Sequence, residues 1–488
     1  MLQDLPVVVD ARLRLPPGLP RKLVADLKRS CTHDDPGFHK KRSAGYWTGG
    51  QSSVIATWQL HDKGTSAESI SLPRGATERL RAIAHSHGFY ARWLDRRVRR
   101  EPVDWPTFRR ELRWYQDQIL EQGMLREQGI IRMPTGTGKS LAALAFAAQT
   151  RQPTLVVMRN KQLLKQWLRA AQEELGMSKR EIGVLVGGSK LRVGARLTLG
   201  LQQTLWSKSF PLDEVAPLFG CVLIDEVQDC AAATFQVVID VFPARYRVGF
   251  SADETRKDRK EFLVYDQFGD VIYEQDRKRL EDEKFIVPVD VVMVPTDFRA
   301  DWYVSAERGE RDWNQLLDEL TTDEQRNQMI VKLTRDVLCA RGETPAVVFS
   351  HRVEHARTIA DEWLVMNGVK CGLLLGGDEH AKRFEQDREM LLDGELPVCA
   401  GTFSAIGTGI DMPKVTAGIM ATPIGNNRQF FGQVRGRVCR SSEGKTSATL
   451  YVMWDRHVFP RMKSDFEKWN DGRVTVAELD DLLRRRAA

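Results

Sequence analysis

Two short stretches of the chain carry residue types suited to phosphate chemistry, one to bind the phosphate group and one to bind a metal ion and water. In "RMPTGTGKSLAALAFA", residues 132–147, Lys139 and Ser140 follow two glycines and open a predicted helix. A glycine-rich turn between a strand and a helix directs backbone N–H groups at phosphate oxygens. The lysine reaches the β- and γ-phosphates, and the hydroxyl beside it binds Mg²⁺. The stretch predicts a nucleotide phosphate site, although Met133 stands where a first glycine or alanine is common.

The second stretch, "VLIDEVQ" at residues 222–228, has two acids at the end of an apolar run. Asp225 at a strand tip can hold Mg²⁺ through water, and Glu226 can orient a water molecule for attack. An acidic pair at a strand end is a weak signal alone, but this one follows Lys139 by 86 residues. We therefore expect both carboxylates to lie at the phosphate site.

Three further features have ordinary structural explanations when each is taken alone. Gln116 in "LRWYQ" can pair with an adenine edge, or it can be a surface residue. The arginines of "GQVRGRVCR", Arg435, Arg437 and Arg440, can stabilise charge on a transferring γ-phosphoryl group or form a basic helix face. Asp411 ends the glycine-rich stretch "GTFSAIGTGID", which suits a loop that senses nucleotide.

These residues need a framework, and β-branched runs alternate with helical patterns from about residue 110 onward. The predicted strands are 154–158, 221–226, 246–252, 346–350, 398–403, 417–423 and 448–454, and the predicted helices include 160–175, 353–367 and 379–393. Such alternation indicates parallel sheets with helices on both faces. Because the strands are too many for one sheet, we predict an α/β fold with two halves.

Composition suggests where the domains divide. We predict a small α+β domain over 1–108, a first α/β half over 109–290, a linker or hinge over 291–325, a second half over 326–460 and a C-terminal helical tail over 461–488. The hinge is inferred from the polar stretch at 297–315.

The positive charge of the chain is concentrated near the N-terminus. Residues 1–110 contain 20 Lys and Arg against 11 Asp and Glu, whereas the remaining residues contain 52 and 55. Arginines between 92 and 100 alternate with Tyr90, Trp93 and Trp105. A basic module with aromatic residues suggests a polyanion partner. A solvated basic surface is the alternative, and Trp93 can equally belong to the core of the module.

Several classes of protein are disfavoured by the same sequence. No run of about 18 apolar residues predicts a transmembrane helix, and residues 1–18 lack the pattern of a signal peptide. Seven cysteines without a CxxC pair argue against a zinc ribbon or a redox motif. We expect no membrane partner and a reducing, cytoplasmic setting.

Taken together, the motifs resemble those of superfamily 2 helicases, in family order over roughly residues 109–456. The matching stretches are "LRWYQ" (the Q-type motif), "PTGTGKS" (I), "NKQLLKQW" (Ia), "LGLQQTL" (Ib), "DEVQ" (II), "RYRVGFSADETRKD" (III and its continuation), "VVFSHRVEHA" (IV), "GTFSAIGTGIDMP" (V) and "QVRGRVCR" (VI). Within that superfamily the chain is similar to UvsW-like phage helicases and their XPB-like and RecG-like relatives. The resemblance implies two RecA-like lobes that bind ATP and Mg²⁺ and step along nucleic acid.

The resemblance assigns roles residue by residue. It implies ATP binding by Gln116, Thr135, Gly136, Thr137, Gly138, Lys139, Ser140, Gly409, Asp411 and Gln433. It implies catalysis by Lys139, Asp225, Glu226, Gln228, Arg437 and Arg440, with Mg²⁺ held by Ser140 and Asp225. It implies coupling by Ser251, Ala252 and Asp253, and nucleic-acid contacts by Asn160, Lys161, Gln203, His351, Arg352 and Thr402.

Three positions depart from the usual motifs. Gln228 stands where many relatives have His, and Thr408 replaces a common Glu. In motif III, Asp253 and Glu254 replace the usual Thr-Pro, which puts the efficiency of unwinding in doubt more than ATPase activity.

The sequence thus predicts an ATP-dependent DNA helicase or translocase that acts on branched or duplex DNA in replication, recombination or repair, in a bacterial or phage-infected cell. An RNA helicase is one alternative, because contacts to the 2′-hydroxyl are not visible in a sequence. Others are the motor subunit of a restriction or defence complex and an ATP-gated clamp that does not unwind.

Overall fold

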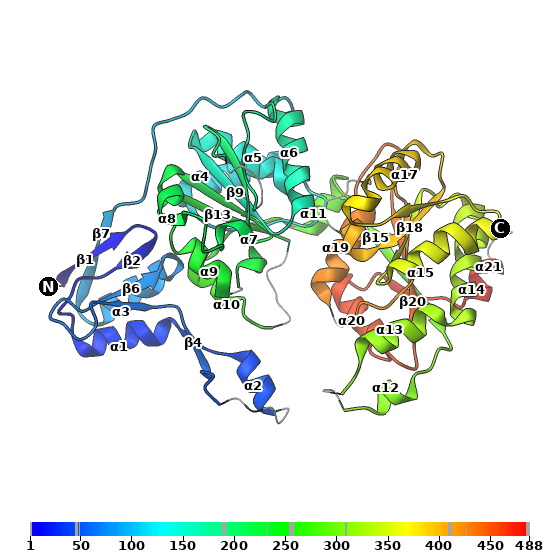
Figure 1. Cartoon of the computed structure of the whole chain (residues 1–488), viewed down its shortest axis with the longest axis horizontal. Coiled ribbons are helices and arrows are strands. Elements are labelled where there is room, and N and C mark those ends of the chain that lie inside the picture. Colours follow the sequence, from blue (N-terminus) through cyan, green and yellow to red (C-terminus); the bar gives the residue numbers. More distant parts are fainter. Residues whose placement is uncertain are drawn as a thin grey trace. The chain divides into compact units, whose positions relative to one another are not determined.

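The computed structural model describes residues 2–43, 47, 49–187, 192–231, 233–252, 258–307, 310–407, 412–425 and 427–484. Its internal contacts divide the chain into two compact units (Figure 1). Unit 1 comprises Met1–Pro134 and Gly138–Gln275, and unit 2 comprises Thr135–Thr137 and Asp276–Ala488. In the described part of the chain, no helix has the length and apolar character needed to cross a membrane.

Unit 1 begins with a small domain, which we call the N-terminal domain (residues 2–95). Its five-stranded sheet has the order β5-β6-β2-β1-β7, in which only β1 and β7 are parallel. The strands are β1 (Gln3–Val9), β2 (Arg12–Arg14), β5 (Gln59–His61), β6 (Ser69–Pro73) and β7 (Phe89–Asp95). The helices α1 (Arg21–Ser30) and α3 (Thr77–Ser86) bury Leu23, Leu27 and Leu80 in one apolar core with this sheet. The mixed sheet confirms the predicted α+β domain.

A hairpin leaves this sheet between α1 and β5. It pairs β3 (Thr32–Asp34) with β4 (Val54–Ala56) in antiparallel register, and α2 (Pro36–Ser43) lies between the two strands in sequence. A long segment then leads from β7 to α4 (Figure 1). It runs over the first α/β half through backbone bonds from Val103 to Arg151 and from Arg109 to Glu174.

The rest of unit 1 is the first α/β half, which we call lobe 1 (residues 114–134 and 138–275). Its seven strands are all parallel, in the order β10-β11-β9-β12-β13-β8-β14. They are β8 (Gln128–Arg132), β9 (Thr154–Met158), β10 (Gly183–Leu185), β11 (Leu197–Leu201), β12 (Cys221–Asp225), β13 (Tyr246–Ser251) and β14 (Val271–Glu274). The helices are α4 (Trp114–Arg126), α5 (Lys139–Thr150), α6 (Lys161–Leu175), α7 (Gln202–Leu205), α8 (Leu212–Val215), α9 (Ala233–Ile239) and α10 (Phe262–Phe268).

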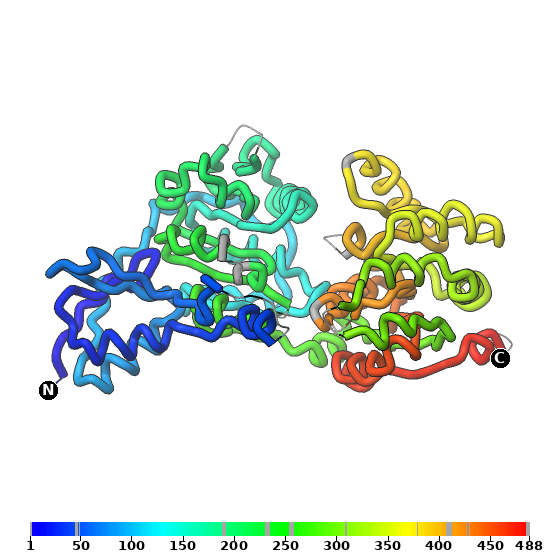
Figure 2. The backbone as a smooth tube through the Cα atoms, turned by 60° about the horizontal axis from the view of Figure 1, so that its bottom comes forward, coloured from blue at the N-terminus to red at the C-terminus, as the bar shows by residue number. Residues whose placement is uncertain are grey.

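Buried charges join the N-terminal domain to lobe 1, and both views show the two side by side (Figures 1 and 2). The Arg12 guanidinium donates to the carboxylate of Asp240, and both groups are largely buried. The Asp266 carboxylate, 1% exposed, accepts bonds from Thr57, His33 and Arg79 of the N-terminal domain. Because each of these groups loses its partner if the domains separate, separation carries a large cost.

Unit 2 contains the second parallel sheet, and we call it lobe 2. Its strand order is β17-β18-β16-β19-β20-β15-β21. The strands are β15 (Val289–Thr296), β16 (Ala346–Ser350), β17 (Cys371–Leu374), β18 (Val398–Thr402), β19 (Ala417–Met420), β20 (Ala448–Asp455) and β21 (Val474–Val476). The helices are α11 (Arg277–Asp282), α12 (Asp301–Ser305), α13 (Trp313–Thr322), α14 (Glu324–Lys332), α15 (Val353–Arg357), α16 (Leu364–Met366), α17 (Ala381–Asp393), α18 (Phe403–Gly407), α19 (Arg428–Val438), α20 (Met462–Trp469) and α21 (Leu479–Arg484).

The structure divides the chain at other positions than the sequence suggests. The contacts change units after Gln275, whereas 109–290 was expected to be one half. The expected hinge, 291–325, contains most of β15, which pairs with β20 and β21 inside the lobe 2 sheet. The expected tail, 461–488, supplies the edge strand β21 and lies along the body of unit 2 (Figure 2). The expected hinge and the expected tail both belong to the lobe 2 sheet because β15 pairs with β20 and β21, which lie more than 150 residues later in the chain. Local composition does not reveal such long-range pairing.

Candidate active site

The predicted phosphate cradle follows β8, which lies between β13 and the edge strand β14 of the lobe 1 sheet. The backbone N–H of Met133 donates to the carbonyl oxygen of Ser251 at 2.8 Å and extends the pairing of β8 with β13. Met133 is fully buried, so the unusual residue at this position is a core side chain. Gly136 and Gly138 have φ angles of 87° and 81°, a left-handed conformation that favours glycine. The turn ends where α5 begins at Lys139.

A chain of side-chain bonds leads away from the cradle lysine. Lys139 Nζ donates to Glu226 Oε1 at 2.9 Å. Gln228 Nε2 donates to the other oxygen of Glu226 at 2.7 Å, and Ser251 Oγ donates to Gln228 Oε1 at 2.7 Å. The predicted motifs I, II and III are therefore linked at the carboxyl ends of β12 and β13. A nucleotide phosphate would compete with Glu226 for the lysine.

Asp225, the last residue of β12, has a different environment. Its carboxylate is buried, and the indole N–H of Trp167 on α6 donates to Oδ2 at 2.8 Å. Burial and, to a smaller extent, the adjacent charge of Glu226 together raise the pKa of Asp225 to about 6, against the opposing effect of Lys139. A divalent cation would stabilise the ionised carboxylate that burial disfavours.

The residues present fit Mg²⁺ rather than a metal held by protein alone. In the described ranges, no three side chains of His, Cys, Asp or Glu form a group that could hold a metal ion. Mg²⁺ is usually held by one or two protein oxygens together with water and substrate phosphates. Asp225 and Ser140, the second residue of α5, supply oxygens of that kind.

Gln116 is a buried residue and not a surface one. Its side chain is 1% exposed, and its Oε1 accepts a bond from the backbone N–H of Arg113 at 2.9 Å, which caps the start of α4. A side-chain carbon at Gly138 would lie 3.0 Å from Nε2 of Gln116. The amide therefore lies against the cradle, and glycine at 138 leaves room for it.

Comparison with known proteins agrees with this geometry. Residues 109–255 match the family model described as type III restriction enzyme, res subunit. The probable helicase D10 of Escherichia phage T5 is 28% identical over 345 residues, which are 70% of this chain and 71% of that protein. The DNA 3'-5' helicase XPB of Kineococcus radiotolerans is 25% identical over 71% of this chain and 60% of its own length.

A solved structure adds a likeness of fold. S. cerevisiae Dbp5 bound to RNA and ADP BeF3 has a TM-score of 0.54 and 16% identity, over 76% of this chain and 91% of Dbp5. The chain is a superfamily 2 helicase. The two parallel sheets are its RecA-like lobes, and the enzyme is driven by ATP.

The motif VI arginines of the helicase are not equivalent. Arg435 on α19 donates to the carbonyl oxygen of Trp469 and to Oδ1 of Asn470, both at 3.0 Å. Burial lowers the pKa of Arg435 to about 10, and the charge of Arg277 contributes. Arg435 therefore holds α19 against the end of α20 and is structural.

The other motif VI residues, Gln433, Arg437 and Arg440, occupy different positions from Arg435 on or just after α19. Gln433 and Arg437 lie on α19 itself. Arg440 follows the helix and forms an antiparallel bridge with Ile286, before β15. Their expected roles in nucleotide binding and catalysis stay predictions.

Some expected site residues lie outside the described part of the helicase. Asp253 of motif III, and Gly409 and Asp411 of motif V, are among them. Ser251 and Ala252 lie inside it, and Ser251 ends β13 in the bonded chain described above. The structure thus describes the first half of the expected coupling motif.

The expected nucleic-acid contacts of lobe 1 share one sheet edge. Lys161 follows β9 and Gln203 follows β11, and these strands are parallel neighbours in which Met158 faces Leu201. Both side chains are exposed. Asn160 instead caps α6, because its side chain accepts a bond from the N–H of Leu163 at 2.9 Å. Lys161 and Gln203 are therefore the better placed pair.

In lobe 2 the expected contacts are largely engaged within the protein. Arg352 forms an ion pair with Asp318 at 2.8 Å. His351 bonds Thr422 through its backbone N–H at 3.0 Å and its ring at 2.9 Å. Thr402 is only 5% exposed, and its hydroxyl bonds inside the turn that begins α18. Thr402 therefore stabilises the turn between β18 and α18.

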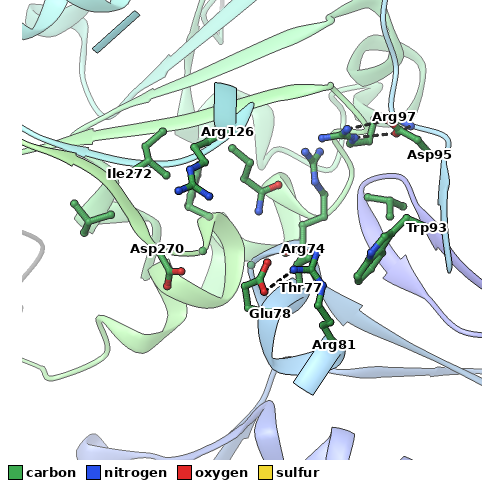
Figure 3. A pocket seen from close by; sticks show the side chains of 16 residues that line it. Arg74, Thr77, Glu78, Arg81, Trp93, Asp95, Arg97, Arg126, Asp270 and Ile272 are labelled. Atoms are coloured by element: carbon green, nitrogen blue, oxygen red, sulfur yellow. Dashed lines mark hydrogen bonds and ion pairs between the residues drawn. The ribbon is translucent and has the colours of Figure 1, made fainter. Parts of the chain in front are cut away.

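Two features of the helicase escaped sequence reasoning. Trp167 donates to the carboxylate of Asp225, yet the sequence shows it only as one of the apolar residues of the helix at 160–175. A polar cavity of about 530 Å³ lies between the N-terminal domain and lobe 1 (Figure 3). Two of its arginines form ion pairs within the protein, Arg81 with Glu78 and Arg97 with Asp95. None of the residues assigned by the helicase motifs lines it, and both domains do, so we regard it as part of the domain interface.

Proposed function

We propose that this helicase uses ATP to translocate on or unwind DNA, with branched or duplex DNA as its substrate, in replication, recombination or repair. The bonded chain from Lys139 through Glu226 and Gln228 to Ser251 carries the proposal, because it connects phosphate binding to the motif expected to couple hydrolysis to movement. Relatives that are named a DNA helicase and a DNA translocase support DNA as the substrate along which the protein moves.

The residues of lobe 1 divide the chemistry among them. Lys139 holds the β- and γ-phosphates, which frees one oxygen of Glu226. Gln228 keeps its bond to Glu226 and fixes the carboxylate, which then orients the attacking water. Ser140 and Asp225 would hold Mg²⁺, which would supply positive charge to the phosphate oxygens.

Gln228 also links the nucleotide site to the end of β13, where motif III begins. When Glu226 shifts between lysine and water, the amide of Gln228 moves with it, and the bond to Ser251 shifts the end of β13. Ser251 is the first of the expected coupling residues of motif III, so a shift of the strand end would move that motif. In lobe 2, Arg437 and Arg440 meet the charge that develops on the transferred phosphoryl group.

A second candidate is a motor subunit of a restriction or defence complex. The description of the matched family model, a restriction-enzyme res subunit, favours it. Such a subunit would bind a nuclease chain in its host and would hydrolyse ATP on duplex DNA. Capture of a nuclease partner from the native host, with DNA cleavage that requires both chains, distinguishes this candidate.

The central experiment measures ATP turnover on a panel of nucleic acids. The protein is assayed alone and with single-stranded DNA, duplex, forked DNA, a four-way junction and RNA, with Glu226→Gln as the matched inactive control. We expect stimulation by duplex or branched DNA well above that by RNA. Stimulation by RNA alone would replace DNA as the substrate, and no stimulation by any nucleic acid would refute the proposal.

A further inference from the structure

The hairpin of the N-terminal domain carries an unusual concentration of charge. We call the described residues of 36–54 the basic arm: 36–43, 47 and 49–54. It has Lys40, Lys41 and Arg42 in succession, and the whole segment 36–54 contains no Asp or Glu. None of the residues of α2, which holds these cations, is buried. The helix therefore presents its side chains to solvent and adds nothing to the core.

The base of the arm is fixed to lobe 1. Asp35 forms an ion pair with Lys260 at 2.9 Å, which lowers the pKa of that carboxyl despite its partial burial. The ring of His33 stacks on Phe262 with centroids 4.2 Å apart. Ile55 of β4 packs against the apolar core of lobe 1. Since Phe262 begins α10 and Lys260 lies just before that helix, the arm is attached to lobe 1 at the start of α10.

The cations of the arm differ from two of the arginines that the sequence emphasises, Arg92 and Arg97, whereas Arg96, Arg99 and Arg100 are exposed. Arg92 pairs with Asp4 at 2.6 Å, and Arg97 pairs with Asp95 at 2.8 Å, so those positive charges are compensated within the protein. Lys40, Lys41 and Arg42 form no ion pair with any described residue, and Lys41 has only a long bond to the neutral Gln51. The tryptophan of the arm, Trp47, is 86% exposed.

We propose that the basic arm is a nucleic-acid contact that grips the phosphate backbone of the substrate beside lobe 1. This rests on the proposed function. Uncompensated Lys and Arg side chains bind phosphates without regard to sequence, and release of counterions makes that binding salt-dependent. The exposed Trp47 ring stacks on a base that is unpaired at a junction or a strand end. Because the arm is fixed to lobe 1, the grip moves with the motor.

The test compares two triple variants of the full-length protein. Lys40→Gln, Lys41→Gln and Arg42→Gln remove the arm charges together. Arg21→Gln, Lys22→Gln and Lys63→Gln remove the same charge from exposed positions of the same domain and serve as the control. Affinity for a fork and for a plain duplex is measured between 50 and 200 mM salt, with ATP turnover without DNA and melting temperature as checks of folding.

We expect the arm variant to lower the salt slope by about 0.9 for each duplex phosphate that the arm no longer neutralises, up to about 2.7. The control should keep the slope, and both variants should keep basal turnover. Equal slopes in the arm variant and the wild type overturn the proposal and favour an acidic protein as the partner of the arm. Equal losses in both variants also overturn it, since net charge alone would then explain them.

A single substitution tests the aromatic residue. Trp47→Ala should weaken binding to a fork several-fold more than binding to a blunt duplex, whereas Trp47→Phe should restore most of the difference. A uniform loss on both substrates overturns the stacking role. Failure of the wild type to bind any nucleic acid would instead refute the proposed function, so the two failures are distinguishable.

Discussion

The buried carboxylate of Asp225 makes the stability of the nucleotide-free protein depend on pH. Its pKa is about 6 in the folded protein because of burial and the charge of Glu226, against about 3.9 in an unfolded chain. A group whose pKa is raised on folding contributes stability below the unfolded value, and that contribution is lost as pH rises through the folded value. The window is therefore roughly pH 4 to 6.

The size of the effect follows from the shift. Two pKa units correspond to about 3 kcal/mol of destabilisation when Asp225 is fully ionised, and to roughly 0.5 kcal/mol near pH 4. Asp225→Asn removes the charge but keeps an oxygen that can accept the bond from Trp167. At pH 8 the variant should therefore be more stable than the wild type by up to about 3 kcal/mol, or a melting temperature roughly 6–12 °C higher.

The assay is thermal unfolding of the nucleotide-free protein from pH 4 to pH 8, followed in parallel for the wild type and Asp225→Asn. Asp213→Asn, which changes the same charge at an exposed position on α8, is the matched control and should leave the curve unchanged. The difference between Asp225→Asn and the wild type should grow through the window and level off above it. A difference that is absent at pH 8, or that is constant with pH, would refute the reasoning.

Three further predictions address turnover, coupling and the core of lobe 2. Lys139→Ala should abolish ATP turnover because the phosphates lose their point charge, whereas Glu226→Gln should bind ATP without hydrolysing it; normal turnover in Glu226→Gln would contradict the assigned role. Ser251→Ala removes the bond to Gln228, so unwinding per ATP should fall while DNA-stimulated turnover stays within a few-fold; parallel losses in both rates would exclude a coupling role. Asp455→Ala strands the buried Arg326 and should cost about 3–5 kcal/mol in denaturant unfolding, whereas Asp297→Ala at the exposed pair with Arg456 should cost about 0–1 kcal/mol; similar losses would contradict this contrast.

Seven strands of the two lobes, β9, β12, β13, β16, β18, β19 and β20, could be predicted because each is a short, buried apolar run. Strands such as β14 and β21 are less buried and are not predicted. The predicted segments 154–158 and 346–350 coincide with β9 and β16. The predicted helix at 353–367 also forms, although its middle, Thr358–Trp363, is a π-helix. Sheet membership could not be predicted in the same way. The run that forms β15 looks alike whichever sheet it joins, and only its pairing with β20 assigns it to lobe 2.

In the candidate site, too, some contacts could be predicted from the sequence and others could not. Each motif is recognised from a few consecutive residues, and the order of the motifs predicts that Lys139 and Glu226 lie at one site. In the structure, Lys139 Nζ is 2.9 Å from Glu226 Oε1. The orientation of the Gln116 side chain depends on the turn before α4. The hydrogen bond from Trp167 to Asp225 depends on how α6 packs on the sheet. Neither contact has a local signature, because a buried glutamine and a buried tryptophan occur in many helices without a functional role.

Charge along the chain locates the basic module at the N-terminus, but it does not show which of the cations there face solvent without a partner. A count of Lys and Arg cannot separate cations that face solvent from cations that neutralise nearby acids. Arg97 illustrates the second kind, because it is paired with both Asp95 and Glu127. In contrast, the cations of the basic arm have no acid within their own segment, and the structure leaves them in solvent.

The buried ion pairs at the base of the N-terminal domain decide how its role must be tested. Deleting the domain would leave Asp240 and Asp266 without their arginines and would expose the surface that it covers on lobe 1. Weaker DNA binding in such a deletion would follow from damage to lobe 1 as readily as from the absence of the arm. Substitutions in the arm leave those pairs intact. They therefore separate a role in gripping nucleic acid from a role in holding the motor lobe together.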